Sequence, residues 1–252
     1  GGLTALILSR FDPEQAFKLI RDHKVSIMIA GVPTAYTAML NHPNFRKTDF
    51  SSLRFACGGG APLAEKTLKE WERWTGVPAL EGYGMTEGAP TCNNPLVGER
   101  RVLSVGKPVF GIEMEIVDVE TGTINLNNGE AGEIRVRGNH IADGYFNNEE
   151  ESSTAFREGW LYTGDIAYRD DDGFFYIVDR AKDMAIVSGF NVFPREIDEV
   201  LMAHPHITEA ASIGIPDDHK GETIKAFVSL IEGSNITEDA IKSYCQKKLV
   251  GY

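Results

Sequence analysis

Apolar and polar positions along the first 80 residues predict helices and strands in turn. Asp12 and Pro13 mark a helix start, with an N-cap followed by proline at the first helical position. An apolar run of strand length at 25–30 is broken by Gly and Pro at 31–34, where a short helix begins. The same order repeats, with a strand at 53–57, a turn at 58–62 and a helix at 63–75. We expect Leu68, Trp71 and Trp74 on one face of that helix. This succession predicts an α/β fold with a largely parallel sheet.

After Gly106 the pattern changes to short alternating segments, which indicate antiparallel strands. They lie at 112–117, at 133–136 and around Asp165 and Tyr176, with a short helix at 149–156 and a hairpin turn at 170–173. Beyond Lys182 a small α+β unit is predicted, with strands at 184–187, 210–215 and 226–231 and helices at 194–204 and from 237. We therefore expect a partial large domain at 1–179, with parallel-rich sheets and a small antiparallel barrel-like sheet. A hinge at 180–182 and a truncated α+β C-terminal domain at 183–252 should follow.

Composition narrows the functional classes. The chain has 252 residues and a formal net charge of −12 without a long basic run, which argues against nucleic acid as a partner. Three widely spaced cysteines, Cys57, Cys92 and Cys245, predict reduced thiols in a cytoplasmic protein. Both ends look cut, so we expect a fragment of a longer protein. No sequence pattern predicts an oligomeric state.

Two glycine-containing segments follow predicted strands and are candidates for a ligand site. Gly58–Pro62 lets a planar ligand approach the backbone, and the next helix start offers N–H groups to an anion. The alternative is a plain strand-to-helix turn. In Gly82–Glu87 the glycines expose Tyr83 for stacking on a base, and Thr86 with Glu87 suit phosphate oxygen and Mg²⁺. The alternative is a strand-end loop with a solvated Glu87.

An acid and an arginine follow on two neighbouring strands, just before the predicted hinge. Asp165 comes directly after a turn glycine, and Arg180 ends the next strand. Such a pair suits the hydroxyls of a ribose, whereas the alternatives are an Asx-type turn and a surface ion pair. The six histidines share no metal-ligand spacing, and no nucleophile-elbow pattern is present.

Together these segments resemble the adenylate-forming superfamily of acyl-CoA synthetases, peptide-synthetase adenylation domains and firefly-type luciferases. The resemblance covers essentially the whole chain and rests on GGGAPL at 58–63, EGYGMTE at 81–87, GEIRVRG at 132–138, GWLYTGD at 159–165 and DRAKDMAIVSGFNVFPREID at 179–198. With GVPTAYTAML at 31–40, it is most similar to bacterial long-chain fatty-acid–CoA ligases. It implies that a fatty acid and ATP form an acyl-adenylate, which coenzyme A then converts into a thioester.

The resemblance also implies a nucleotide site. Adenine would lie against the Tyr83 ring and the backbone of Gly60, Ala61 and Pro62. The rest of that segment would line the nucleotide, namely Glu81, Gly82, Gly84 and Met85. Thr86 would contact the α-phosphate or the attacking carboxylate, and Glu87 would bind Mg²⁺. Asp165 and Arg180 would hold the ribose.

Three further roles follow from the same resemblance. Lys182 stands at the hinge residue, about which the small domain turns between the two half-reactions. Gly189 lies in the loop that lines the coenzyme A path. The acyl pocket is expected at Val32, Pro33, Thr34, Gly58 and Gly59.

The chain departs from the family pattern in two parts that stabilise charge. The phosphate loop, which ends in Pro-Lys-Gly, would lie upstream, and the C-terminal catalytic lysine would lie beyond Tyr252. Ile186 stands where some luciferase-like members carry a lysine. One such group is commonly worth about two to three decades in rate. The 252 residues alone are therefore expected to adenylate poorly.

Three functions stay open at this point. The first is a long-chain fatty-acid–CoA ligase. The second is an adenylate-forming enzyme for a medium-chain, aryl or amino acid, and the third is a non-catalytic nucleotide-binding module. Peripheral contact with the inner face of the membrane also stays open because the expected substrate is apolar, although no basic amphipathic helix supports it.

Overall fold

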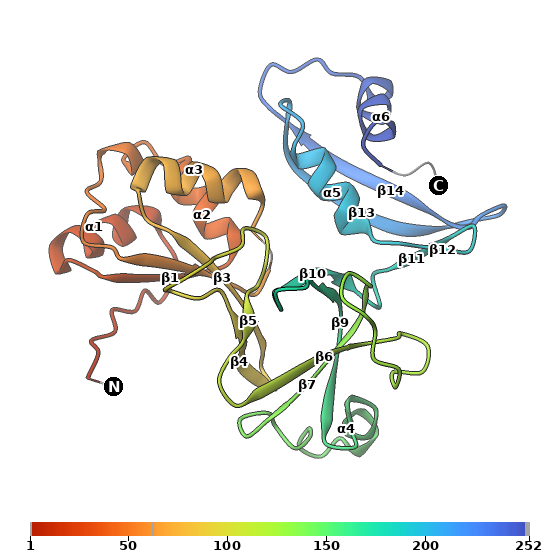
Figure 1. Ribbon diagram of the computed structural model, residues 1–252. Coiled ribbons are helices and arrows are strands. Elements are labelled where there is room, and N and C mark those ends of the chain that lie inside the picture. The colour runs from red at the N-terminus through yellow and green to blue at the C-terminus, as the bar shows by residue number, and fades with distance from the viewer. Residues whose placement is uncertain (1, 62, 250–252) are drawn as a thin grey trace. The chain divides into compact units, whose positions relative to one another are not determined.

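The computed structural model describes residues 2–61 and 63–249 (Figure 1). The chain forms two compact units. The first unit consists of Gly1–Glu113, Gly138–Asp143 and Asp172–Phe175. The second unit consists of Met114–Arg137, Gly144–Asp171 and Tyr176–Tyr252. The expected hinge at 180–182 lies inside the second unit, and its role as a hinge stays a prediction.

A five-stranded mixed sheet forms the framework of the first unit, in the order β1-β2-β3-β4-β5. Its strands are β1 (Ile27–Gly31), β2 (Phe55–Gly58), β3 (Ala79–Met85), β4 (Gly88–Asn93) and β5 (Lys107–Pro108). β1, β2 and β3 run parallel, as the alternation of strands and helices predicts. β4 pairs antiparallel with both β3 and β5, so the direction of pairing changes at β3.

Three helices pack one aromatic core in this unit: α1 (Pro13–His23), α2 (Pro33–Leu40) and α3 (Glu65–Thr75). α2 and α3 lie side by side over the sheet (Figure 1). Tyr36 and Trp71 are fully buried, with their rings edge to face at 5.1 Å. α1 starts as predicted, because the Asp12 carboxylate accepts a hydrogen bond from the Gln15 N–H at 2.8 Å. A single 3₁₀ turn at Phe45–Lys47 adds Phe45 to the core.

The expected position of Trp74 on the buried face of α3 is wrong. Leu68 and Trp71 are buried, but Trp74 is 46% exposed. At about 100° per residue, Trp74 lies about 120° around the helix from Leu68, outside the buried stripe. Its ring instead stacks against the Arg46 guanidinium, 4.3 Å from the ring centre.

The second sheet has the order β10-β9-β7-β6, with β8 paired to β9. Its strands are β6 (Ile112–Val117), β7 (Gly132–Gly138), β8 (Phe156–Arg157), β9 (Trp160–Arg169) and β10 (Phe175–Arg180). Alternate residues of β7, Ile134 and Val136, are fully buried, which confirms the predicted alternation. Helix α4 (Glu149–Ala155) is capped by Asn148, whose side chain accepts from the Glu151 N–H.

The C-terminal part of the second unit is a small α+β arrangement. Its sheet has the order β12-β11-β14-β13. The elements are β11 (Ala185–Val187), β12 (Phe190–Val192), α5 (Pro194–Met202), β13 (Ile207–Asp217), β14 (Gly221–Leu230) and α6 (Glu238–Gln246). β12 is missing from the sequence-based prediction, because its three residues are too few to show an alternation of apolar and polar positions. The α/β class, with its parallel, antiparallel and C-terminal α+β parts, is confirmed.

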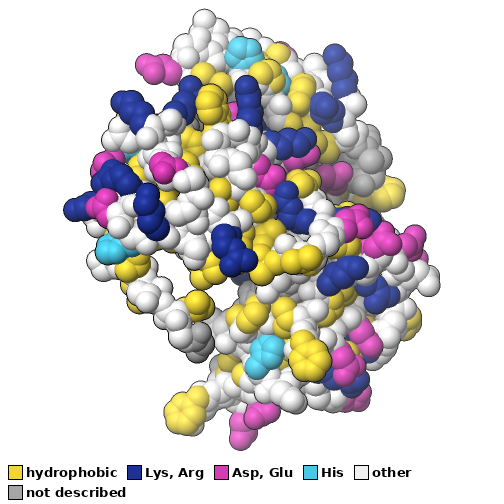
Figure 2. All heavy atoms as spheres, turned by 60° about the vertical axis from the view of Figure 1, so that its left-hand side comes forward, with side chains coloured by type: hydrophobic (Ala, Val, Ile, Leu, Met, Phe, Trp, Pro, Cys, Tyr) yellow, Lys and Arg dark blue, Asp and Glu magenta, His cyan; other side chains and the backbone are white. Residues whose placement is uncertain are grey.

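The surface mixes charged and apolar side chains. Figure 2 shows basic and acidic side chains interspersed on one face, with apolar side chains between them. Among the described residues, no helix combines the length and the apolar character that crossing a bilayer requires.

Candidate functional site

Three predicted site segments meet at the carboxyl ends of β1 and β2 and at Gly82, inside β3. The N–H of Gly59, just past the end of β2, donates to the carbonyl of Gly31, the last residue of β1, at 2.7 Å. A Cβ on Gly59 would lie 3.3 Å from the Gly82 carbonyl oxygen, and one on Gly60 would lie 3.8 Å from Val32 Cγ1. The carboxyl ends of parallel strands are the usual place for a ligand crevice in α/β sheets. The segments expected to form the acyl pocket and to hold the adenine are thus neighbours within the first unit.

The turn after β2 is ordered by a buried acid. Glu81 is 6% exposed, and its Oε1 accepts from the Leu63 N–H at 3.1 Å. Gly60 has a φ of 75°, which a glycine adopts without strain, and Ala61 beside it is exposed. Pro62 lies outside the described residues. Sequence reasoning placed Glu81 along the nucleotide, and the structure gives its carboxylate a partner that fixes the glycine turn.

The remaining acyl-pocket candidates start helix α2 and line the other side of this turn. Val32 is the N-cap residue of α2 and is 46% exposed, Pro33 follows it, and Thr34 is exposed. Gly58 is buried, and a Cβ there would lie 2.6 Å from Leu63 Cδ1. A side chain at Gly58 would therefore require the Leu63 side chain to shift, whereas Val32 and Thr34 are exposed.

The segment 82–87 is the second half of β3 and the turn into β4, rather than a loop. Met85 pairs with Gly88, so Thr86 and Glu87 form a two-residue turn. A Cβ on Gly82 would lie 2.1 Å from Asn93 Oδ1, and one on Gly84 would lie 3.0 Å from the Ala89 Cβ. The glycines are therefore required by the close approach of β4, a reason that the sequence alone does not give.

The turn at Thr86 and Glu87 presents a hydroxyl and a carboxylate. Thr86 is exposed and Glu87 half-buried, and the Glu87 carbonyl accepts from the Ala142 N–H at 2.7 Å. Within residues 2–61 and 63–249, no group of three or more His, Cys, Asp and Glu side chains could share a metal ion. Mg²⁺ takes few protein carboxylates and fills its shell with phosphate oxygens and water. The donors at this turn therefore fit a magnesium ion that arrives with a nucleotide.

Asp165 and Arg180 contact each other in the second unit. Arg180 Nε lies 3.3 Å from Asp165 Oδ1, with side chains 60% and 14% exposed. Asp165 is part of β9 rather than of a free turn, but the pairing with β7 shifts register opposite it, between Glu133 and Arg135. Gly164 sits in this bulge with a φ of 70°. The bulge projects Asp165 from the strand toward the end of β10, where Arg180 lies.

The last two predicted positions follow Arg180 in the chain. Lys182 is exposed in a turn that is closed by hydrogen bonds from the Asp183 and Met184 N–H groups to the Arg180 carbonyl. Gly189 is the second residue of a two-residue hairpin turn between β11 and β12, with a φ of 83° and open space around its Cα. Both positions belong to the second unit, as do Asp165 and Arg180, whereas residues 31–34, 58–61 and 81–87 belong to the first.

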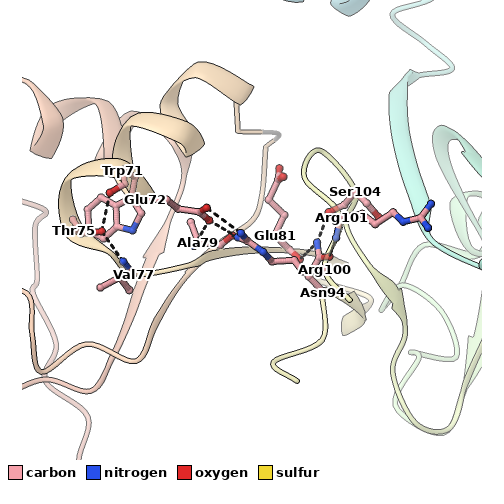
Figure 3. A network of polar contacts seen from close by, with 10 residues as sticks. All are labelled: Trp71, Glu72, Thr75, Val77, Ala79, Glu81, Asn94, Arg100, Arg101 and Ser104. Carbon is pink, nitrogen blue, oxygen red and sulfur yellow. Dashed lines mark hydrogen bonds and ion pairs between the residues drawn. The ribbon is translucent and has the colours of Figure 1, made fainter. Parts of the chain in front are cut away.

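A polar network beside β3 is absent from the sequence-based prediction (Figure 3). Arg100 forms a two-pronged ion pair with Glu72 and also donates to the Ala79 carbonyl at 2.8 Å. Burial alone would raise the pKa of the Glu72 carboxyl, but hydrogen bonds from Arg100 and from the Ala79 N–H hold it below its usual range. No local pattern could have revealed this pair, because 28 residues separate its members.

Comparisons with known proteins identify the family. Residues 1–146 match the family model described as AMP-binding enzyme, and residues 196–252 match the one described as AMP-binding enzyme C-terminal domain. A long-chain-fatty-acid–CoA ligase of Bacillus subtilis (strain 168) is 37% identical over 252 residues, which are 100% of this chain and 45% of the relative.

Solved structures agree with this match. The crystal structure of ATP-bound MatB from Rhodopseudomonas palustris gives a TM-score of 0.91 at 35% identity, over 97% of this chain and 48% of that one. The anthranilate CoA ligase AuaEII, in complex with anthranoyl-AMP, gives 0.85 at 33% identity, over 95% of this chain and 46% of that one. The chain thus spans less than half the length of each of these proteins. Because the first family model matches more than half of its residues, the chain belongs to the AMP-binding enzyme family.

Proposed function

We propose that the full-length protein is an ATP-dependent long-chain fatty-acid–CoA ligase. In the first step a carboxylate oxygen of the fatty acid attacks the α-phosphorus of ATP, and the bond to the β-phosphate breaks to release pyrophosphate. In the second step the coenzyme A sulfur attacks the acyl carbonyl, the thiol loses its proton, and AMP leaves. No covalent intermediate on the enzyme is needed, so the protein contributes positioning and charge stabilisation.

The observation that carries this proposal is the meeting of the Gly31, Gly59 and Gly82 backbones beside the Tyr83–Glu87 segment. An added Cβ would meet nothing within 4 Å at Gly31 and only Val32 Cγ1, at 3.8 Å, at Gly60. This open space would admit a flat base, and the Tyr83 ring would stack on it. The Thr86 hydroxyl would donate to the α-phosphate or to the attacking carboxylate. Glu87 would hold Mg²⁺, which supplies positive charge to the phosphate oxygens when bound.

The Asp165–Arg180 pair supports a ribose site in the same proposal. Asp165 is mostly covered, whereas Arg180 is 60% exposed and close enough to donate to the same ligand. An ionised carboxylate accepts hydrogen bonds from two ribose hydroxyls, which are worth more than neutral ones. Lys182 would be the hinge residue and the Gly189 turn would line the coenzyme A path, as the family resemblance implies.

Long-chain specificity is supported by the Bacillus subtilis relative, which is named a long-chain-fatty-acid–CoA ligase. An aryl acid is the second candidate substrate, because the similarly related AuaEII is an anthranilate CoA ligase. Competition between palmitate, decanoate and benzoate for AMP formation by the full-length protein tests the choice. We expect the protein to use palmitate in preference to the other two acids. Preferential use of benzoate would instead favour an aryl acid as the substrate.

Calorimetry with AMP tests the nucleotide site. We expect Asp165→Ala to weaken AMP binding by about ten- to a hundredfold, since a hydrogen bond to a charged group is worth about 1.5–3 kcal/mol. Asp239→Ala serves as the matched control, because it removes an exposed carboxylate on α6 in the same unit. This variant should bind AMP as tightly as the unsubstituted protein, called the parent below. Equal AMP affinity in Asp165→Ala and the parent would refute the ribose assignment. AMP binding without fatty-acid-dependent AMP formation would instead favour a non-catalytic module.

A further inference from the structure

Along the first half of β3, the side that faces away from β2 is hydrogen-bonded by side chains and a loop rather than by a neighbouring strand. On its inner side β3 pairs with β2 from Ala79 to Glu81. On its outer side the pairing with β4 begins only at Gly82, which lies opposite Asn93. Here the outward N–H and carbonyl of Ala79 and the carbonyl of Glu81 are bonded by atoms of other segments (Figure 3).

Glu72 and Arg100 complete the edge at Ala79. Glu72 Oε1 accepts from the Ala79 N–H at 3.0 Å, and Arg100 Nη1 donates to the Ala79 carbonyl at 2.8 Å. The two side chains also bind each other through both oxygens of Glu72, with 29% and 25% of their areas exposed. Together they bond both polar groups of Ala79, as a neighbouring strand would.

Asn94 completes the edge at Glu81. The Glu81 carbonyl accepts from the Asn94 backbone N–H at 3.0 Å and from its side-chain amide at 3.4 Å. The Asn94 Oδ1 accepts from the Arg101 N–H at 3.1 Å, and its amide also donates to the Ser104 carbonyl. Asn94 is 5% exposed, so these bonds lie away from water. The loop that carries Arg100 is thereby tied to β3 at two successive outward positions.

We infer that Arg100, held by Glu72, is a positioning residue for the part of β3 that leads into the nucleotide-contacting turn. The inference rests on the proposed function, because it concerns the placement of Tyr83 and Thr86. Arg100 touches neither the turn nor a ligand position directly. It fixes where β3 lies as the strand passes from β2 to β4, at Ala79, three residues before Gly82 and four before Tyr83. A misplacement of about 1 Å far from the reacting atoms can cost about a hundredfold in rate.

Arg100→Met in the full-length protein tests this role, because methionine keeps much of the stem and removes every hydrogen bond. We expect the KM for ATP and the Kd for AMP to rise about tenfold, with the KM for the fatty acid changed less than about twofold. Arg100→Lys should recover part of the loss, since one ammonium group can reach Glu72 or the Ala79 carbonyl but cannot form the fork. Lys69→Met is the control, because it removes an exposed ion pair with Glu65 on α3, the helix that carries Glu72. It should leave the KM for ATP and the Kd for AMP unchanged.

Hydrogen exchange supplies a second readout. Under conditions where Arg100→Met is fully folded, the amides of 82–87 should exchange about tenfold faster, while those of α1 stay as in the parent. An unchanged Kd for AMP in Arg100→Met overturns the inference. So does a rise in both KM values together with no recovery in Arg100→Lys, because a general loss of structure would then suffice.

A separate variant distinguishes failure of the inference from failure of the proposed function. Thr86→Ala removes the hydroxyl at the turn and leaves the Arg100 contacts intact. If Thr86→Ala and Asp165→Ala both bind AMP like the parent, the proposed nucleotide site fails, whatever Arg100→Met does. If they weaken binding while Arg100→Met does not, the proposed function stands and the positioning role of Arg100 is refuted.

Discussion

Gly82→Ala should separate β4 from β3 and weaken nucleotide binding. The φ of Gly82 lies outside the left-handed region, so alanine there is not excluded by its backbone conformation. The obstacle is contact: the added Cβ would lie 2.1 Å from Asn93 Oδ1 and 3.2 Å from the Cys92 carbonyl oxygen. The Asn93 side chain can rotate away, but the Cys92 carbonyl belongs to the paired backbone of β4 and can shift only with the strand.

The expected size of the effect follows from these two contacts. Overpacking of a closely packed site commonly costs about 1–3 kcal/mol, and each 1.4 kcal/mol corresponds to about a tenfold change in an equilibrium constant. We therefore expect Gly82→Ala to lower the free energy of unfolding of the first unit by about 2 kcal/mol. The Kd for AMP should rise about tenfold or more, because Tyr83 moves with the strand.

A double-mutant cycle isolates the cause. Asn93→Ala removes the shorter contact, so Gly82→Ala combined with Asn93→Ala should recover more than half of the lost stability. Gly59→Ala offers a graded comparison, since its Cβ would meet the Gly82 carbonyl oxygen at 3.3 Å and should cost less. Urea unfolding followed by tryptophan fluorescence gives the stabilities, and calorimetry gives the Kd for AMP. A Gly82→Ala variant with the stability and AMP affinity of the parent would refute the reasoning.

Three further predictions concern stability. Asp12→Ala removes the cap of α1 and should lower the free energy of unfolding, measured in urea, by about 1 kcal/mol. Asp22→Ala, which changes an exposed residue of the same helix, should lower it less. Trp71→Ala empties a fully buried site and should cost about 3–5 kcal/mol with loss of near-UV circular dichroism, and a milder effect would contradict the described core. Glu72 has a folded-state pKa below its usual 4.5, so its stabilisation is present above that pH and is lost as the pH falls through the folded value. The Tm gap between the parent and Glu72→Gln should therefore be wide at neutral pH and narrow in strong acid, and a gap independent of pH would exclude this linkage.

The parts of the fold that follow from local sequence rules could be predicted. The cap at Asp12, the proline that opens α2 and the apolar run of β1 each act over a few residues, and each has a distinct chemical signature. Asp165 and Arg180 were expected on neighbouring strands, and they lie on the adjacent β9 and β10 with their side chains 3.3 Å apart. Such features are readable because the atoms that stabilise them are close in the chain.

The rest depends on contacts between distant residues. The ion pair of Glu72 with Arg100 spans 28 residues, and neither side chain stands out among the charged residues around it. The requirement for glycine at 82 comes from β4, which passes within reach only after the chain has turned back. Trp74 was misplaced because a helical period gives an angle but not the width of the buried face.

The turn at Ser188 and Gly189 affects how the proposed coenzyme A path can be probed. Both residues have positive φ values, 52° and 83°, as a two-residue hairpin of this type demands. An ordinary L-alanine at 189 is strained by about 1–2 kcal/mol before any ligand is present, although the space around Gly189 is open. A mirror-image D-alanine introduced by chemical ligation adopts positive φ without that strain and adds the same methyl group. Comparing the two epimers therefore separates obstruction of the thiol's route from damage to the hairpin, which conventional mutagenesis combines in a single loss of activity.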